Sequence, residues 1–599
     1  MRETIPHIMR QQALANAGRV IHYSLENGEW RPMTWAQAQE HVEAVAAGLD
    51  DHGCRHGDSV AIMGRTCWQW TVADGAILLF GGVTIGIYET STPDQVAYII
   101  NHSESRVLFV AAGQPAERAM AAWKTCPGLE LVIVWGGALP AGAPGRVDSW
   151  DALLQQGRRL TAVNPQTADR LLAQVQPDDV ATLVYTSGTT GPPKGVVLTH
   201  ANLAFVARAS NEVLPIGPDD VGIVFLPLAH SLQRVTLYAG LVGGLLGYFA
   251  PSLDALPETW KVARPTIMAS VPRIFEKVHA RIENTLAAAP PHRQALFRFA
   301  MKIARHRAAL VRAGKPVPLP LQVLHRCFDS LVFSRIRAVF GGRVRYMVSG
   351  GAPIGVELLE FFHALGILIL EGYGLTETSG PATVNGFDAF KLGTVGRAMP
   401  GTELRISEIG EILIRGTGVF REYFKDPEAT AAAFAGAGPD RWFRSGDVGD
   451  LDADGFLRIT DRIKDLIITA GGKNIAPQNI ENLVKSRSPL ISHVVVHGDR
   501  RNYLVALIAL HEDELLGWAE RHGLAGDYPA LCRSEALRQH LEGAISEANR
   551  DLARYEQIKK FAVLEQDLTQ DGGELTPSLK VKRRVVESRN RAVIESMYA

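Results

Sequence analysis

The first part of the chain alternates helical and strand patterns, and this alternation restricts the fold more than any other feature. Thr34 and Gln37 form a capping box at the start of a helical pattern that runs to Leu49, and a second helical pattern begins at Thr92. Apolar runs typical of buried strands lie between and after these helices, at residues 59–63, 106–111 and 131–135. Such alternation predicts an α/β fold with a parallel-rich sheet covered by helices.

The length of 599 residues exceeds the size at which a single hydrophobic core stops growing, so we expect more than one lobe. Short strand patterns beyond Gly410 indicate a small β unit, and a dense charged cluster at residues 461–465 follows them. We place the domain boundary there, with residues 1–461 as a large N-terminal domain and residues 465–599 as a small α+β domain. The basic, Ala- and Leu-rich run at about 283–337 is predicted to be a helical insertion in the large domain.

Charge and cysteine content exclude several classes of protein. Lys and Arg number 62 and Asp and Glu number 63, so no global field attracts nucleic acid, and we expect no nucleic-acid partner. Five scattered cysteines argue against a disulfide framework and a zinc site, and the N-terminus lacks the apolar core of a signal peptide. We therefore expect a cytoplasmic protein. The uncharged run at 235–253 contains four glycines and is predicted to be a buried strand–helix segment rather than a membrane span.

A loop dense in hydroxyls and glycines joins two apolar strands at residues 181–185 and 195–199. Glycines let backbone N–H groups approach an anion, and Lys194 adds positive charge, so the loop predicts polyphosphate binding rather than a plain surface turn. It is not the phosphate loop of the NTPases, which requires glycine where Pro193 stands and serine or threonine where Gly195 stands. A kinase or GTPase that uses that loop is therefore excluded.

The sequence YTSGTTGPPKG at residues 185–195 resembles the signature of the adenylate-forming enzymes, which include acyl-CoA synthetases, luciferases and peptide-synthetase adenylation domains. Further motifs follow in that family's order: EGYGLTE from Glu371, WFRSGD from Trp442, DRIKD from Asp461, GGKN from Gly471 and LTPSLK from Leu575. The resemblance covers nearly the whole chain. It implies a large adenylate-forming domain and a mobile C-terminal domain, joined by a hinge at residues 462–464.

Carried over position by position, the resemblance implies a site for ATP. Thr186 and Glu377 would hold the Mg²⁺ ion that bridges the ATP phosphates, because this ion prefers hard oxygen ligands. Asp447 would accept the two ribose hydroxyls. The remaining nucleotide-binding residues implied by the motifs are Ser187, Gly188, Thr189, Thr190, Gly191 and Lys194 around the phosphates, and Gly351, Ala352, Pro353, Tyr373, Gly374 and Thr376 around the adenine. Taken alone, Glu377 and Asp447 would be ordinary loop acids.

The C-terminal motifs imply further roles. Arg462 would contact the ribose or phosphates, Lys464 would lie at the hinge, and Gly471 and Gly472 would leave room for the pantetheine arm of coenzyme A, a plain turn being the alternative. Lys580 matches the lysine that reaches the acyl carboxylate and the α-phosphate, where positive charge lowers the barrier most. Many relatives have glycine just before this lysine, whereas Leu579 stands here, as in the long-chain fatty acyl branch; the alternative is a solvated surface charge.

His230 matches a family position near the acyl carboxylate, although a lone histidine is more often structural. Apolar residues at 235–249 and 267–271 are candidates for an acyl tunnel, or for plain core. Together these features predict an ATP-dependent long-chain fatty acid–CoA ligase that forms an acyl-AMP and pyrophosphate and then transfers the acyl group to coenzyme A. No covalent enzyme nucleophile is needed, so the lack of a Ser–His–Asp or Cys–His motif is consistent with this reaction.

Several alternatives stay open. The acceptor thiol could belong to a carrier protein, which would make the chain a fatty acyl-AMP ligase, and the substrate could be a medium-chain acid. Two alternatives involve no ligase reaction: a non-catalytic nucleotide-binding paralogue, and a peripheral membrane protein that sequesters fatty acids and uses the basic helix at 305–312 as an anchor on the inner face of a membrane. The sequence leaves the oligomeric state undetermined.

Overall fold

The computed structural model describes residues 3–140, 142–186, 192–470, 473–570, 572–576 and 580–599. The predicted alternation of helix and strand forms an α/β sheet in the order β7-β6-β5-β3-β4-β8-β9, and the predicted fold class is confirmed. Its strands are β7 (Arg146–Ser149), β6 (Leu131–Trp135), β5 (Val107–Ala111), β3 (Ser59–Met63), β4 (Val83–Ile87), β8 (Val180–Thr186) and β9 (Lys194–Thr199). All neighbours are parallel except β8 and β9.

Helices pack on this sheet and follow the predicted caps. Thr34 and Gln37 form the capping box of α2, and Thr92 and Gln95 form that of α4. The helices of this region are α1 (Ile5–Ala15), α2 (Trp35–Asp51), α3 (Trp68–Leu79), α4 (Pro93–Ser103), α5 (Gln114–Trp123), α6 (Trp150–Val163), α7 (Thr167–Leu172) and α8 (His200–Val213). Both capping boxes satisfy backbone groups at the helix start, which explains why the helices begin there.

Two further sheets lie beside the first. One runs β10-β11-β1-β2, from β10 (Val221–Val224), β11 (Leu246–Phe249), β1 (Val20–Glu26) and β2 (Glu29–Thr34). The other runs β12-β13-β14-β15-β16, from β12 (Ile267–Ser270), β13 (Tyr346–Ser349), β14 (Ile369–Leu375), β15 (Gly380–Val384) and β16 (Arg397–Ala398). The uncharged run at 235–253 falls in α9 (Ser231–Gly243) and β11, as predicted. Across the described ranges, no helix has the length and apolarity needed to span a membrane.

The predicted small β unit is an antiparallel sheet. It contains β17 (Thr402–Ile406), β18 (Glu411–Gly416), β19 (Phe434–Ala435), β20 (Trp442–Leu451) and β21 (Leu457–Arg462), with α16 (Pro427–Ala432) before β19. After it come the hairpin of β22 (Ile467–Ile468) and β23 (Asn474–Ile475), and a sheet of β24 (Ile491–His497), β25 (Leu504–Leu510) and β26 (Ile558–Val563). The helices around that last sheet are α17 (Pro477–Ser486), α18 (Glu512–Arg521), α19 (Tyr528–Cys532), α20 (Glu535–Arg550), α21 (Arg583–Arg589) and α22 (Arg591–Tyr598).

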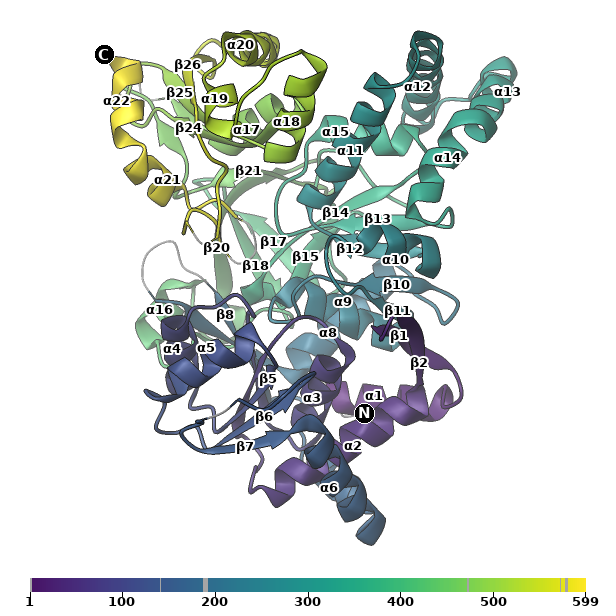
Figure 1. Cartoon of the computed structure of the whole chain (residues 1–599), viewed down its shortest axis with the longest axis vertical. Coiled ribbons are helices and arrows are strands. Elements are labelled where there is room, and N and C mark those ends of the chain that lie inside the picture. Colours follow the sequence, from purple (N-terminus) through teal and green to yellow (C-terminus); the bar gives the residue numbers. More distant parts are fainter. Residues whose placement is uncertain (1–2, 141, 187–191, 471–472, 571, 577–579) are drawn as a thin grey trace.

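The predicted insertion at 283–337 is helical throughout most of its length. It comprises the end of α11 (Pro272–Ala287), α12 (Pro291–Arg312), α13 (Leu319–Phe328), a π-helical turn at Asp329–Phe333 and α14 (Ser334–Arg337). A short 3₁₀ turn at Ala338–Phe340 follows it. Figure 1 shows α12 and α13 projecting from the large lobe next to the small C-terminal lobe.

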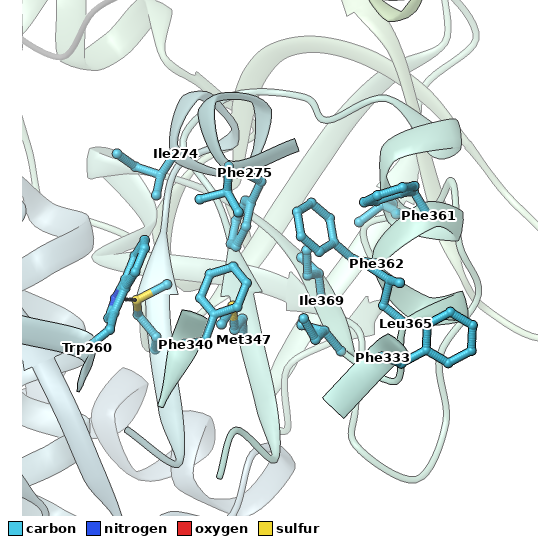
Figure 2. Close-up of a cluster of buried hydrophobic side chains, with 14 of the residues drawn as sticks. Trp260, Ile274, Phe275, Phe333, Phe340, Met347, Phe361, Phe362, Leu365 and Ile369 are labelled. Atoms are coloured by element: carbon cyan, nitrogen blue, oxygen red, sulfur yellow. Dashed lines mark hydrogen bonds between the residues drawn. The ribbon is translucent and has the colours of Figure 1, made fainter. Parts of the chain in front are cut away.

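A cluster of aromatic side chains joins the insertion to the β12-β13-β14 sheet (Figure 2). Its centre is Phe362 on α15 (Val356–Ala364), whose ring contacts those of Phe275, Phe340 and Phe361 at centroid distances of 6.1, 6.2 and 5.4 Å. Trp260 on α10 (Leu256–Ala263) packs on Phe340 from the other side. This core fixes α11, which leads from the edge of the β12 strand into the insertion.

A row of buried polar side chains crosses the ends of the same three strands. Ser270, Ser349 and Glu371 are in register on β12, β13 and β14 and are all buried. Within the described residues, neither serine hydroxyl has a hydrogen-bond partner. Burial raises the pKa of Glu371 to about 8, and a backbone hydrogen bond from Ile354 offsets this only in part. Glu371 is therefore mostly protonated at neutral pH.

We predict that Phe362→Ala lowers the free energy of unfolding by about 3–5 kcal/mol, because it leaves a cavity among fully buried aromatic rings. Denaturant titration would measure the change. The matched control is Phe387→Ala, which removes the same atoms from a ring that is 39% exposed and should cost less than half as much. Equal losses in the two variants would contradict the assignment of Phe362 to the centre of this core.

We predict that Glu371→Gln changes the pH dependence of stability. The pKa of Glu371 is about 8 in the folded protein, against an ordinary value of 4.5 in the unfolded chain. Between these pH values the folded state holds a proton that the unfolded state has lost, so the wild type loses stability as pH rises. The stability of the wild type relative to Glu371→Gln should fall by about 1.4 kcal/mol per pH unit in that window. Glu428→Gln, at an exposed position, is the control and should show no such slope. A difference between wild type and Glu371→Gln that is constant with pH would refute the shift.

Candidate active site

A cavity of about 2480 Å³ is lined by residues of both lobes. Its lining includes every predicted site residue that the structure describes: Thr186, Lys194, His230, Gly351, Ala352, Pro353, Tyr373, Gly374, Thr376, Glu377, Asp447, Arg462, Lys464 and Lys580. Ser187, Gly188, Thr189, Thr190, Gly191, Gly471 and Gly472 lie outside the described residues. Pockets for one small ligand usually measure about 300–1000 Å³, so this cavity has room for more than one.

The phosphate-loop strands are held by a segment that lies far away in the sequence. Thr186 and Lys194 are paired at the open end of β8 and β9. Residues 421–424 run along the other side of β9. Val197 forms backbone hydrogen bonds with both Arg421 and Glu422, and the N–H of Phe424 donates to the carbonyl oxygen of Gly195. This pairing brings Tyr423 next to the loop.

Tyr423 links the phosphate loop to Glu377. The Lys194 Nζ lies 4.9 Å from the centre of the Tyr423 ring, and the Tyr423 hydroxyl donates a 2.8 Å hydrogen bond to Glu377 Oε1. Lys194 also lies 3.7 Å from Asp426 Oδ2. Glu377 follows β14 in a 3₁₀ turn, and its carbonyl oxygen accepts from the backbone N–H of Phe420 at 2.7 Å. The loop lysine and the acidic residue are thus placed by one aromatic side chain.

The environment of Glu377 is suited to a bound cation. Burial raises the pKa of its carboxyl, while the Tyr423 hydroxyl and the nearby Arg462 and Lys580 lower it. The Glu377 carboxylate and the Thr186 end of β8 line the same cavity, and a carboxylate and a hydroxyl are the hard oxygen ligands that Mg²⁺ prefers. The residues present therefore fit the ion.

Two side chains hold the Asp447 carboxylate, one at each oxygen. The Tyr373 hydroxyl donates to Asp447 Oδ2 at 2.6 Å, and Arg462 Nε lies 3.3 Å from Asp447 Oδ1. Asp447 and Arg462 are directly paired on β20 and β21, so the sheet register sets this contact. Burial raises the pKa of Asp447, and Arg462, Tyr373 and Lys580 offset the rise. An ionised carboxylate has about four acceptor positions and each Asp447 oxygen has one partner here, so Asp447 can accept further hydroxyl donors.

Lys580 comes from the C-terminal lobe and lies in the field of these groups. Burial and the positive charge of Arg462 lower the pKa of Lys580 to about 8, while Asp447 and Glu377 act in the opposite direction. In this structure Lys580 is partly buried and lines the cavity. Its ammonium group interacts electrostatically with two carboxylates and an arginine.

His230 lies at the N-terminus of α9 and also lines the cavity. Its Nδ1 accepts a 3.1 Å hydrogen bond from the backbone N–H of Leu232, so in the neutral ring the proton is on Nε2. Burial and the charge of Lys580 lower the pKa of His230 to about 4, so the ring is neutral near pH 7. The next residue, Ser231, has its hydroxyl 3.4 Å from that of Thr376, which joins α9 to the end of β14.

A buried ion pair anchors α9. Arg234 Nη2 lies 2.6 Å from Asp74 Oδ1 on α3, and Arg234 Nη1 donates to Thr182 Oγ1 on β8 at 2.6 Å. The Tyr238 hydroxyl donates to the other oxygen of Asp74, also at 2.6 Å. Removing one partner of such a pair leaves an unpaired buried charge, so this network fixes α9, and with it His230, relative to the phosphate-loop strand.

Two glycines in the nucleotide motifs have clear structural reasons. Gly351 has φ of +83° in the turn after β13, a conformation that side chains rarely adopt. At Gly374, a Cβ atom would lie 1.9 Å from the carbonyl oxygen of Gly380 on the paired strand β15, at a register shift of the hairpin. Any side chain at Gly374 would separate these strands and displace Thr376 and Glu377.

The apolar part of the cavity matches the predicted tunnel segments. Residues from 235–249 and 267–271 that line it are Val235, Leu237, Leu241, Leu245, Phe249, Ile267, Met268 and Val271. Lys464, at the predicted hinge, also lines the cavity and is exposed. Charged and apolar regions therefore meet in one space.

Sequence reasoning missed several residues of this site. Tyr423 and the Asp74–Arg234 pair carry no local motif, because their roles come from contacts over more than 40 residues of sequence. In the sequence, Glu371 stands out only as the first residue of a motif. Its position before Gly372 and Tyr373, in an otherwise apolar strand pattern, is the one signal that could have marked it as a buried acid.

Comparison with known proteins agrees with this geometry. Residues 9–424 match the model of the AMP-binding enzyme family, and residues 464–599 match that of the AMP-binding enzyme C-terminal domain. The chain is 38% identical over 583 residues to long-chain-fatty-acid–CoA ligase FadD15 of Mycobacterium bovis, covering 97% of this chain and 94% of that protein. It is 31% identical to the peroxisomal long chain acyl-CoA synthetase 7 of Arabidopsis thaliana, covering 96% and 82% of the two chains.

Solved structures share the fold. The adenylation domain of a carboxylate reductase from Mycobacterium chelonae superposes with a TM-score of 0.77 at 23% identity, covering 99% of this chain and 91% of that one. The anthranilate CoA ligase AuaEII, in complex with anthranoyl-AMP, gives a TM-score of 0.75 at 19% identity, covering 99% and 98%. With both family models matched and the long-chain relatives aligned over nearly their whole length, the chain belongs to the AMP-binding enzyme family, the adenylate-forming enzymes that its motifs indicated.

Proposed function

We propose that the protein is an ATP-dependent long-chain fatty acid–CoA ligase. The observation that carries the proposal is the position of Lys580 among Glu377, Asp447 and Arg462, in a cavity that continues into an apolar region. Charged groups for a nucleotide and an apolar channel for an acyl chain are both needed to join a fatty acid to AMP. The long-chain-fatty-acid–CoA ligase and acyl-CoA synthetase names of the similar proteins support the same reaction.

In the first half-reaction, a carboxylate oxygen of the fatty acid attacks the α-phosphorus of ATP, and the bond to the pyrophosphate oxygen breaks. Negative charge gathers on the oxygens of the α-phosphate and on the leaving pyrophosphate. Lys580 supplies positive charge at this point, and Asp447 holds the ribose hydroxyls so that the phosphorus stays aligned. Thr186 and Glu377 would hold the Mg²⁺ ion, which would neutralise charge on the phosphates.

In the second half-reaction, the sulfur of coenzyme A attacks the acyl carbonyl carbon, and the carbon–oxygen bond to AMP breaks to give acyl-CoA and AMP. We propose that residues 462–464 form the hinge between domain 1–461 and domain 465–599, and that Gly471 and Gly472 border the pantetheine path. The end of β21 at Arg462 and the start of the C-terminal family match at residue 464 support this boundary.

The apolar part of the cavity offers room to bury an acyl chain. Because each buried CH₂ contributes about 0.8 kcal/mol, longer chains should bind more tightly. Free coenzyme A is the proposed acceptor, with a carrier-protein thiol as the competing one. We place the protein in the cytoplasm. We also propose peripheral contact with the inner face of a membrane, because a long-chain fatty acid partitions into lipid.

We predict that Lys580→Ala lowers the rate of fatty-acid-dependent pyrophosphate release from MgATP by at least about 100-fold, because the loss removes charge stabilisation specific to the transition state. Lys559→Ala, at an exposed lysine of the same lobe, is the matched control and should retain the wild-type rate. Acids of increasing chain length, with and without coenzyme A, complete the assay.

The products separate the alternatives. Long acids with coenzyme A should yield acyl-CoA and AMP, whereas pyrophosphate release with no acyl-CoA would favour a carrier-protein acceptor. A wild-type protein that releases no pyrophosphate with any acid would overturn the ligase assignment. An unchanged rate in Lys580→Ala would remove Lys580 from the adenylation step while leaving the ligase assignment intact.

We predict a second signature of Lys580 in the pH dependence of adenylation. Its pKa is lowered to about 8, and the active form is the protonated one, so kcat/KM for pyrophosphate release without coenzyme A should fall as pH rises through about 8. Lys580→Arg keeps its charge at higher pH, so its lower activity should stay level between pH 7 and 10. The same decline in both proteins would assign the titration to another group.

A further inference from the structure

The helical insertion carries a strong local charge that the balanced composition of the whole chain conceals. Residues 291–337, from α12 to α14, contain ten Lys and Arg residues and one acidic residue, Asp329. Arg337 pairs with Asp329 at 2.6 Å, and Arg312 pairs with Glu360 at 2.9 Å. The other eight basic side chains form no ion pair with any described residue of the chain. They are Arg293, Arg298, Lys302, Arg305, Arg307, Lys315, Arg326 and Arg335.

The same helices expose large apolar side chains. Leu319, Val323 and Leu331 occur at four- and eight-residue spacing along α13 and the π-helical turn, and are 73%, 54% and 57% exposed. Three more from α12 are at least 44% exposed: Leu296, Phe299 and Val311. Of the 21 large apolar side chains exposed in the described residues, six therefore come from this short segment. Scattered exposed apolar residues are ordinary, but this concentration is not.

The two helices pack together and project from the sheets. Figure 1 shows α12 and α13 side by side and extending away from the sheets, and the Phe299 and Phe328 rings join them edge to face at 5.7 Å. Phe297, Ala300 and Met301 of α12 are buried and belong to the same hydrophobic core as Phe275 and Phe362. One side of the hairpin is thus fixed in the core, which leaves the opposite side without a partner in the described structure.

We propose that this projection docks the protein on an anionic lipid surface. Basic side chains next to exposed aliphatic ones match the two layers of a bilayer interface, where cations meet phosphate headgroups and apolar side chains enter the acyl boundary. Long Lys and Arg side chains also lay their methylene stems along apolar surface while their charges stay in water. A purely electrostatic contact with an acidic partner would use the basic side chains but not the exposed aliphatic ones, whereas a bilayer interface uses both.

The docking surface is connected to the cavity. Residues 288–290 join α11 to α12, and the first two turns of α11 line the cavity with Arg273, Ile274 and Lys277. If the cavity binds a fatty acid, as proposed above, docking would place its lining close to the lipid phase that contains the substrate. The lipid-binding property itself does not depend on that reaction.

The test is co-sedimentation of the full chain with vesicles of pure phosphatidylcholine, or of phosphatidylcholine with about 30% phosphatidylglycerol, at low and high salt. We expect the wild type to bind the anionic vesicles at least tenfold more tightly than the neutral ones, and to be released by salt. Arg298→Glu/Lys302→Glu/Arg305→Glu should lose at least tenfold in binding. The matched charge control is Arg500→Glu/Arg533→Glu/Arg538→Glu on the exposed surface of the other lobe, which should bind as the wild type.

The apolar contribution is tested separately. Leu319→Ser/Val323→Ser/Leu331→Ser should weaken binding at high salt, where electrostatic attraction is screened. Leu14→Ser/Val163→Ser/Ile409→Ser removes side chains of 77%, 86% and 68% exposure from other surfaces and should have no effect. Pyrophosphate release from a water-soluble short acid, measured without vesicles, checks that each variant is folded if the wild type supports it, and circular dichroism checks it otherwise.

The proposal is overturned if the wild type binds neither vesicle, if it binds both equally, or if the insertion variants bind as tightly as their controls. Binding to an acidic protein with no binding to vesicles would also overturn it in favour of a protein partner. Vesicle binding in the absence of any ligase activity would leave this proposal standing and refute the proposed function instead.

Discussion

Two buried carboxylates and two cations depend on one another at the centre of the cavity. Burial alone raises the pKa values of Glu377 and Asp447, and it lowers that of Lys580. Each group is kept closer to its charged form by the opposite charges around it, so no member can be removed without changing the others. The site is assembled only when Lys580, which the C-terminal lobe supplies, lies with groups held in the 3₁₀ turn after β14 and on β20 and β21.

Contacts between the lobes hold this arrangement. Lys485 Nζ on α17 lies 3.0 Å from Glu276 Oε1 on α11, and Arg273 at the start of α11 lies 4.0 Å from Asp567. Asn284, at the far end of the same helix, donates to Glu514 on α18. These polar contacts are partly exposed, so each contributes little and can be exchanged for water. A small lobe held in this way can leave its position without disrupting either hydrophobic core.

Much of this fold follows from local sequence signals. The capping boxes at Thr34 and Thr92 and the apolar strand runs give the parallel sheet correctly, because short-range hydrogen bonds and burial patterns determine them. The family resemblance predicts that the motif residues share one site, and those that the structure describes line one cavity. Tyr423, Asp74 and Arg234 could not be predicted, since their importance arises from tertiary pairing: Tyr423 reaches Glu377 only because residues 421–424 add to β9.

The ionisation of Glu371 has the same origin, because a glutamate in a motif becomes a neutral acid only when the folded chain buries it beside Ser349 and Ser270. Whole-chain charge illustrates the converse problem. A net charge of −1 suggests a protein with no electrostatic preference, yet the segment from α12 to α14 concentrates ten cations against a single acid. Electrostatic attraction at physiological salt acts over about 8 Å, so a partner responds to the charge of a surface rather than to that of the chain. The position of charge on the fold, which composition averages away, therefore decides which partners the protein can meet.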